Sequence, residues 1–183
     1  ELYRKTGDEK YMKQAVNYGR MEPVTPWMGA DSARHYQWYP FINVGHYLLS
    51  NSPDKRVGDE FKRNLRTGIE RVFEKAQTNP FLNGIPYIWC SNNLVSALVT
   101  QCRLYRESTD DVRYEEMEAA LRDWLFGCNP WGTSMIVGLP SWGDTPEYPH
   151  SSYVTAGIGN TPGGLVDGPV YGAIFNGLLG VKI

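Results

Sequence analysis

Residues 54–77 have the sequence DKRVGDEFKRNLRTGIERVFEKAQ, and this stretch carries the clearest fold signal in the chain. Its apolar side chains recur at steps of three and four, the spacing that aligns one face of an α-helix. Charged residues occupy most of the other face. The stretch is therefore predicted to be a long amphipathic helix whose apolar face meets a core. That face consists of Val57, Phe61, Leu65, Ile69, Val72, Phe73 and Ala76.

Helical patterns continue on both sides of this segment. A first helix is predicted after a capping box at Thr6–Glu9, in which a hydroxyl and a carboxylate three residues later cap the first turn. Residues 91–106 are apolar around most of the helix circumference, so this helix is predicted to be buried. The remaining helices are predicted for residues 40–49, 111–126 and 169–179. The expected fold class is all-α.

A short sequence pattern occurs twice. Leu2–Asp8, followed by Tyr11, is similar to Leu104–Asp110, followed by Tyr114, at an offset of about 102 residues. Each copy contains a helix end, a short polar turn and the start of a new helix. Repeated helical hairpins that cannot bury their faces alone stack into a solenoid or close into a toroid. The alternation of amphipathic and almost wholly apolar helices favours the toroid, and chance similarity of two turns is the alternative.

Composition and charge exclude several function classes. The 183 residues suffice for one domain with a core, and the net charge of -2 argues against the basic stripe of a nucleic-acid-binding protein. No apolar run approaches the roughly 20 residues that cross a bilayer. The chain begins Glu-Leu-Tyr-Arg without an initiator Met, so we expect its start to be a cut. Aromatic residues make up 13% of the chain, and such rings either fill a core or stack on sugar rings.

Cysteine and histidine usage indicates no cofactor and no metal site. The cysteines, Cys90, Cys102 and Cys128, are odd in number and widely spaced, so we expect buried free thiols. The three histidines lack a carboxylate or thiol at ligand spacing. His35 and His46 are expected to be structural.

The region from about Gly127 to Gly168 is the longest stretch without a helical pattern. About 40 residues without regular structure are too many for a simple connection in a compact domain. Loops on a rigid scaffold often carry function, and this one is rich in Gly, Pro and Trp. It is therefore predicted to be the substrate-facing rim of a carbohydrate-handling domain. Asp144 and Glu147 form its best local carboxylate pair, which could act as acid and base or be solvated loop carboxylates. Asp167 is expected to fix the loop by hydrogen bonds.

Four motifs follow one another between residues 87 and 171. They are Trp89-Cys90-Ser91-Asn92, then Gly127-Cys128-Asn129-Pro130 continuing to Gly138, then Pro149-His150, then Gly163–Pro169. Their order and spacing resemble glycoside hydrolase family 9. Its members carry Trp-Gly-Ser-Asn, Leu-Gly-x-Asn-Pro-x-x-x-Ser-(Tyr/Phe)-Val-x-Gly, Pro-His-His-Arg and Gly-x-Leu-Val-x-Gly-Pro.

The resemblance implies an incomplete (α/α)6 barrel in which residues 1–183 are part of the catalytic domain. It also implies inverting hydrolysis of β-1,4-glucans such as cellulose, which needs two carboxyl groups about 6.5–9.5 Å apart. In the family the base lies in an Asp-(Ala/Gly)-Gly-Asp motif and the acid in an Asn-Glu motif, and neither motif occurs in this chain. The chain ends at Val181-Lys182-Ile183, just after the helix that precedes the family's acid. We therefore expect no catalytic residue here and an inactive isolated chain.

The resemblance assigns a substrate contact to His150, and aromatic residues of the loop and its surroundings are further candidates from their setting. Pro-His-His-Arg is Pro-His-Ser-Ser in this chain, so only His150 carries over, and Ser151 and Ser152 replace the second His and the Arg. The expected glycan-contacting residues are His150, Trp131, Trp142, Trp89 and Tyr153.

Three hypotheses for function remain open from the sequence. The first is part of a β-glucan hydrolase, whose partner is a polysaccharide or oligosaccharide and whose location, from the resemblance alone, is extracellular or periplasmic. The alternatives are a non-catalytic glycan-binding module of the same fold and a helical-repeat scaffold. Apolar helix faces without partners in half a toroid also predict self-association.

Overall fold

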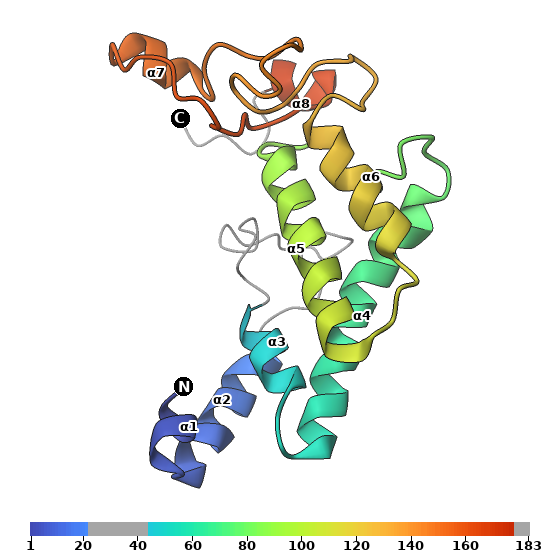
Figure 1. Cartoon of the computed structure of the whole chain (residues 1–183), viewed down its shortest axis with the longest axis vertical. Helices are drawn as coiled ribbons and strands as arrows, with labels where there is room; N and C mark the ends of the chain where they lie inside the picture. Colours follow the sequence, from blue (N-terminus) through green and yellow to red (C-terminus); the bar gives the residue numbers. More distant parts are fainter. Residues whose placement is uncertain (22–43, 178–183) are drawn as a thin grey trace.

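The computed structural model describes residues 1–21 and 44–177 of the chain. Helices dominate this part, whose β-structure is limited to two isolated bridges from Ile136 to Leu139 and to Leu165. The loop region lies at one end of the molecule and the first two helices lie at the other (Figure 1). The described helices are α1 (Leu2–Thr6), α2 (Glu9–Met21), α3 (Val44–Ser50), α4 (Lys55–Ala76), α5 (Ser91–Thr109), α6 (Glu115–Leu125), α7 (Ser151–Thr155) and α8 (Gly172–Asn176).

Residues 54–77 form α4 almost as predicted, with one residue fewer at each end. The Asp54 side chain accepts a hydrogen bond from the Arg56 backbone N–H at 2.9 Å and so caps the first turn. The apolar stripe is confirmed as the core face, because most of its members are fully buried. These are Phe61, Leu65, Ile69, Val72 and Ala76.

The helix α5 packs against both α4 and α6 and is the centre of the main core (Figure 1). Its predicted burial is confirmed, since Leu94 and Leu98 pack in one cluster with Trp124 of α6. The buried amide of Gln101 is also satisfied, because its Nε2 donates to the Leu65 carbonyl oxygen of α4 at 2.8 Å. The core therefore joins α4, α5 and α6, and α5 contacts both of the other helices.

The two similar turns share one backbone geometry, so the repeat is present in the structure. Gly7 after α1 and Asp110 after α5 both adopt the left-handed conformation, with φ of 70° and 58°. Each backbone N–H donates to the carbonyl oxygen four residues earlier, of Tyr3 and Arg106 respectively, at 2.8 Å. Gly7 therefore corresponds to Asp110, one residue later than the sequence alignment predicted.

The cap at the start of α2 differs from the prediction. The Thr6 hydroxyl accepts from the Asp8 backbone N–H at 3.2 Å, and the Asp8 carboxylate accepts from the Lys10 backbone N–H at 3.0 Å. Asp8 therefore caps α2, and the predicted capping box at Thr6–Glu9 is wrong. A carboxylate at this position also meets the positive end of the helix dipole.

The start of α6 also differs from the prediction. The helix begins at Glu115 and not at residue 111. The Asp111 carboxylate accepts from the Tyr105 hydroxyl at 2.9 Å and from the Arg113 backbone N–H at 3.1 Å. These bonds hold the intervening residues in a turn before the helix starts.

Other predicted bounds are adjusted as well. The helix predicted for residues 169–179 is the shorter α8, and residues 178–179 lie outside the described residues. The loop predicted for residues 127–168 is not wholly irregular, because it contains α7. The helix predicted for residues 40–49 corresponds to α3, with its first four positions outside the described residues, where His35 also lies.

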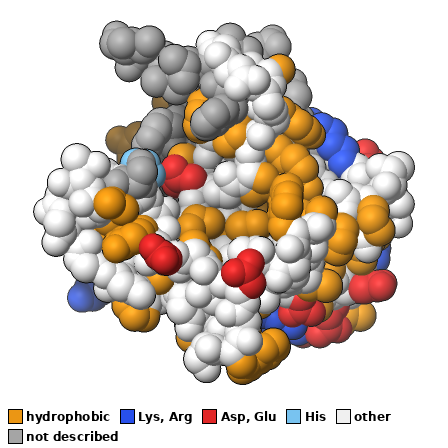
Figure 2. Space-filling model, turned by 90° about the horizontal axis from the view of Figure 1, so that it is seen from above, with side chains coloured by type: hydrophobic (Ala, Val, Ile, Leu, Met, Phe, Trp, Pro, Cys, Tyr) orange, Lys and Arg blue, Asp and Glu red, His pale blue; other side chains and the backbone are white. Residues whose placement is uncertain are grey.

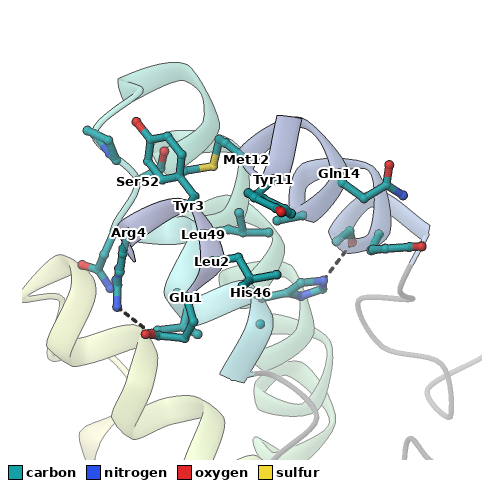
Figure 3. A pocket seen from close by; sticks show the side chains of 17 residues that line it. Glu1, Leu2, Tyr3, Arg4, Tyr11, Met12, Gln14, His46, Leu49 and Ser52 are labelled. Atoms are coloured by element: carbon teal, nitrogen blue, oxygen red, sulfur yellow. Dashed lines mark hydrogen bonds and ion pairs between the residues drawn. The ribbon is translucent and has the colours of Figure 1, made fainter. Parts of the chain in front are cut away.

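The first three helices, α1 to α3, surround a cavity of about 620 Å³ (Figure 3). On its wall the buried His46 places Nε2 3.0 Å from the Gly19 carbonyl oxygen and its ring 5.3 Å from that of Phe61. The prediction that His46 is structural agrees with this burial. The wall also contains Tyr11, Met12 and Leu49, and self-association through such apolar surface stays a prediction.

The three cysteines are free thiols but do not share the predicted burial. Cys102 is buried, and this burial raises the pKa of its thiol. Cys90 is half-buried and Cys128 is exposed. The expectation of buried thiols is therefore wrong for Cys128.

Candidate functional site

The loop region covers the end of the helices where α5 begins and α6 ends (Figure 1). Asn129 fastens its first part, because Nδ2 donates to the carbonyl oxygens of Trp124 at 2.9 Å and Thr133 at 2.8 Å. The Ser134 hydroxyl donates to the Leu125 carbonyl oxygen at 3.2 Å. Since Asn129 and Ser134 are buried, these motif residues hold the loop in place and do not face a ligand.

The last part of the loop is attached to the first turn of α5. The Asn92 backbone N–H donates to the Asp167 carbonyl oxygen and its side-chain Nδ2 donates to the Val166 carbonyl oxygen, both at 3.0 Å. The Ser91 hydroxyl donates to the Pro169 carbonyl oxygen at 2.9 Å. The start of α5, where backbone N–H groups lack helical partners, thus serves as the anchor for this segment.

Two left-handed backbone positions permit this close approach. Gly168 has φ of 100°, and an added Cβ would lie 2.5 Å from the Ser91 Oγ. Cys90 has φ of 59° at the position where the family motif has Gly. Burial, reinforced by the nearby Asp167 carboxylate, raises the pKa of the Cys90 thiol.

Trp131 belongs to a group of aromatic rings at this end. Its ring centroid lies 6.1 Å from that of Tyr87 and 6.0 Å from that of Trp124, and Tyr87 lies 5.3 Å from Tyr171. Trp124 is buried, as predicted for a core residue, whereas Trp131 and Tyr171 are 53% and 52% exposed. We call Tyr87, Trp131 and Tyr171 the aromatic platform. Exposed rings backed by a core residue can stack on the C–H face of a sugar.

Figure 2 looks down on this end of the molecule. Apolar side chains gather across the middle of the view, and carboxylates lie at their edges. A surface of rings and carboxylates suits an uncharged, polyhydroxylated ligand better than an anion, which the carboxylates would repel. The exposed large apolar residues of this region are Phe126, Trp131, Leu139, Trp142, Val154, Ile158 and Tyr171.

His150 is held by its neighbours at the start of α7. Its Nδ1 accepts from the Ser152 backbone N–H at 3.1 Å and lies 2.8 Å from the Ser152 Oγ. Its Nε2 lies 4.0 Å from Asp167 Oδ2. A serine at the position of the family's Arg therefore supports the one histidine that carries over.

The other predicted glycan contacts lie on different elements of the same region. Trp142 is 88% exposed on the loop. Tyr153 is half-buried within α7, and Trp89 is half-buried two residues before the start of α5. The structure thus gathers three groups at one end: the aromatic platform, the pair of His150 and Asp167, and these separate rings.

Tyr87, Tyr171 and Asp167 complete this surface, although no motif singled them out as ligand contacts. Tyr87 lies two residues before Trp89, and Tyr171 lies two residues after Pro169. Their proximity to the ends of the motifs was the available signal. The backbone of Asp167 fixes the loop, as expected, whereas its carboxylate faces His150.

The carboxylate pair suggested for the loop has a structural role in part. The Thr133 hydroxyl donates to the Asp144 carboxylate, and the Asp144 carbonyl oxygen accepts from the Ser134 backbone N–H at 2.9 Å. These bonds favour a loop-fixing role for Asp144 over acid–base work with Glu147. Within residues 1–21 and 44–177, no cluster of three or more His, Cys, Asp or Glu is placed to hold a metal ion. None of the helices described there is long and apolar enough to cross a membrane.

Residues 1–177 match the sequence model of glycosyl hydrolase family 9. The chain belongs to glycosyl hydrolase family 9. The match covers every described helix, so the N-terminal helices and the loop region are both parts of a family 9 structure.

Known family 9 proteins resemble this chain in sequence and in fold. It is 25% identical to the xyloglucan-specific endo-beta-1,4-glucanase BoGH9A of Bacteroides ovatus, over 92% of this chain and 29% of that enzyme. The crystal structure of a metagenome-derived family 9 endoglucanase superposes with a TM-score of 0.67 at 21% identity, over 92% of this chain and 30% of that one. The crystal structure of family 9 endoglucanase J30 superposes with a TM-score of 0.66 at 23% identity, over 92% of this chain and 30% of that one.

The predicted fold class is confirmed by these structures. The described part of the chain is helical, and its structural neighbours are family 9 enzymes, which have the (α/α)6 barrel fold. The chain spans about 30% of the length of the relatives it matches. The 620 Å³ cavity lies among α1–α3 at the end opposite the loop motifs, so cavity size alone does not locate the functional site.

Proposed function

We propose that this family 9 chain supplies the glycan-holding rim of a β-1,4-glucan hydrolase. The observation that carries the proposal is the joint presence at one end of the aromatic platform and His150, on a loop anchored to α5. In this role Trp131, Trp142 and Trp89 stack on sugar rings, while His150 and Tyr153 make polar contacts. The substrate is a β-1,4-glucan or a related plant polysaccharide.

The reaction that we propose is inverting hydrolysis, with both catalytic carboxylates outside these 183 residues. An inverting enzyme leaves room for a water between its base and the sugar. The family's Asp-(Ala/Gly)-Gly-Asp and Asn-Glu motifs do not occur in the sequence, and this supports a binding role without catalysis for the residues present. From the family membership we also propose an extracellular or periplasmic location.

Hydrolysis assays on the full-length protein test this proposal. We expect reducing ends to be released from carboxymethylcellulose or xyloglucan, and NMR of the first product to show the α-anomer. Initial formation of the β-anomer would contradict inversion. The 183-residue chain alone is expected to release no reducing ends above the level of a blank, and turnover by it would contradict the assignment of catalysis elsewhere.

A non-catalytic glycan-binding protein is the second candidate. The observation that favours it is the replacement of the family's second His and Arg by Ser151 and Ser152. Binding of cello-oligosaccharides without release of reducing ends by the full-length protein would select this alternative. A scaffold role predicts that neither binding nor hydrolysis is observed.

A further inference from the structure

We propose that His150 and Asp167 form a donor–acceptor pair that binds one hydroxyl group of the glycan, with Ser152 determining which ring nitrogen of His150 is the donor. The proposal rests on the proposed function, because it specifies a polar contact within the same rim. It assigns a ligand-binding role to Asp167 and a positioning role to Ser152.

The hydrogen bonds of His150 determine its tautomer. A backbone N–H is always a donor, and the Ser152 backbone N–H points to Nδ1 at 3.1 Å. Nδ1 must therefore offer its lone pair and cannot carry a hydrogen. In the neutral imidazole the hydrogen then lies on Nε2, which faces Asp167. The Ser152 Oγ at 2.8 Å from Nδ1 can donate to the same nitrogen.

The gap between the two groups fits a hydroxyl oxygen. Nε2 and Asp167 Oδ2 are 4.0 Å apart, which is too long for a direct hydrogen bond. An oxygen about 2.8 Å from each of them closes the gap, since such bonds have lengths of about 2.7–3.0 Å. That oxygen accepts from Nε2–H and donates its own hydrogen to the carboxylate. Both partners are accessible, with side chains 54% and 49% exposed.

Both sides of the gap are held before a ligand arrives. The Asp167 backbone is attached to α5 through Asn92, and Gly168 packs directly on that turn. Pro149, next to His150, packs against Gly164, where an added Cβ would lie 3.0 Å from the proline ring. Groups fixed in advance lose little conformational entropy on binding, which favours affinity.

Titration calorimetry with cellotetraose on the full-length protein tests the pair. Removal of a charged hydrogen-bond partner in Asp167→Ala is expected to weaken binding about 10-fold or more. Asp167→Asn, which keeps a weaker acceptor, is expected to lie between this variant and the unaltered protein. The matched control is Asp123→Ala, whose carboxylate is similarly exposed (55%) on α6 and is expected to leave binding unchanged.

The tautomer provides a second readout that a purely structural role would not produce. Nitrogen-15 NMR of the imidazole is expected to show hydrogen on Nε2 of His150 in both the unaltered protein and Asp167→Ala. Addition of cellotetraose is expected to slow exchange of this hydrogen only when Asp167 is present. Hydrogen on Nδ1, or equal affinity of Asp167→Ala and the unaltered protein, would overturn the pair while leaving the rim intact. Absence of any cellotetraose binding by the unaltered protein would overturn the pair and the proposed function together.

Discussion

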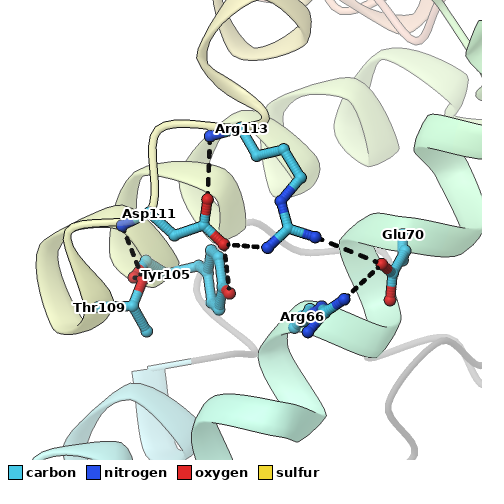
Figure 4. Close-up of polar contacts among 6 residues, drawn as sticks. All are labelled: Arg66, Glu70, Tyr105, Thr109, Asp111 and Arg113. Carbon is cyan, nitrogen blue, oxygen red and sulfur yellow. Dashed lines mark hydrogen bonds and ion pairs between the residues drawn. The ribbon is translucent and has the colours of Figure 1, made fainter.

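The two ends of α5 are built for different tasks. Its C-terminal end is closed by buried Tyr105 and Tyr114 and by a set of ion pairs in which Arg113 contacts both Asp111 and Glu70 (Figure 4). Its N-terminal end anchors a loop whose rings and His150 remain accessible.

The difference between the ends separates the residues that stabilise the fold from those that are available to bind a ligand. At the C-terminal end, packed rings and ion pairs between side chains stabilise the contact of α5 with α4 and α6. At the N-terminal end, anchoring is done by backbone and small polar groups, which leaves larger side chains free to meet a ligand. We therefore expect changes at the C-terminal end to alter stability, and changes at the N-terminal end to alter glycan affinity.

The largest expected effect is a loss of stability when an aromatic ring is removed at the C-terminal end of α5. Tyr114→Ala removes a buried ring that contacts Phe73 at 5.3 Å and Tyr105 at 5.9 Å between centroids. The free energy of unfolding should fall by about 3–5 kcal/mol. Urea unfolding measures this value, and Tyr114→Phe, which keeps the ring, serves as the control. A loss below about 1 kcal/mol would show that this end is not well packed.

The next largest effect is expected from the close contact of Gly168 with the N-terminal end of α5. Gly168→Ala places a Cβ 2.5 Å from the Ser91 Oγ and 2.6 Å from the Asn92 Cγ. We expect a loss of about 1–3 kcal/mol in stability, together with weaker binding of cellotetraose, because the loop must move off α5. Gly163→Ala is the matched control, since it has a similar positive φ of 85° but no atom within 4 Å of its added Cβ. Equal affinities of the two variants would contradict the anchor.

Loss of a partly buried ion pair at the C-terminal end of α5 should lower stability by a smaller amount. Arg106 binds Glu118 at 2.9 Å and Glu115 at 3.1 Å, with 11% and 56% of these carboxylate side chains exposed. Glu118→Gln is expected to lower stability by about 1–2 kcal/mol, because a charged hydrogen bond inside the protein is weakened. Glu115→Gln should change it by less than about 1 kcal/mol, as for exposed pairs. Urea unfolding of both variants checks the order, and the reverse order would be inconsistent with the burial.

The smallest expected effect is a pH dependence from the same end. Burial, followed by the hydrogen bond to Asp111, raises the pKa of Tyr105 to about 12, against about 10 in an unfolded chain. Between these two pKa values the Tyr105 hydroxyl has lost its proton in the unfolded state but keeps it in the folded state. Stability therefore falls as pH rises from about 10 to about 12. Tyr105→Phe should reduce this decline in urea unfolding at about pH 9 and about pH 11. An unchanged slope would mean that Tyr105 does not hold its proton.

The sequence predicted what local patterns determine. The stripe of α4 and the start of α5 at Ser91 follow from side-chain spacing, and both were predicted within one residue. The start of α6 was missed because it depends on the contact of Tyr105 with Asp111, which only the folded turn creates. The repeated pattern of Leu2–Asp8 and Leu104–Asp110 was predicted, but its register came from residue identity alone. Backbone hydrogen bonds instead align Gly7 with Asp110.

The candidate site was predicted in part. The motifs pointed to His150, Trp131 and the loop, since these residues lie within the family pattern. Tyr87 and Tyr171 come from segments far apart in the chain, and only folding brings their rings to 5.3 Å. The direction of the Asp167 carboxylate was also not predictable, because it depends on the anchor to α5.

Affinity for cellotetraose in Trp131→Ala tests the central claim most directly. Trp131 is half-exposed and lies beside Tyr87 in the aromatic platform, so its removal should cost binding and little stability. Titration calorimetry on the full-length protein is expected to show binding weakened about 10-fold or more, as for a central aromatic contact, with the melting temperature lowered by less than about 4 °C. Unchanged affinity in a folded variant would contradict the assignment of this end of α5 as the glycan-holding rim.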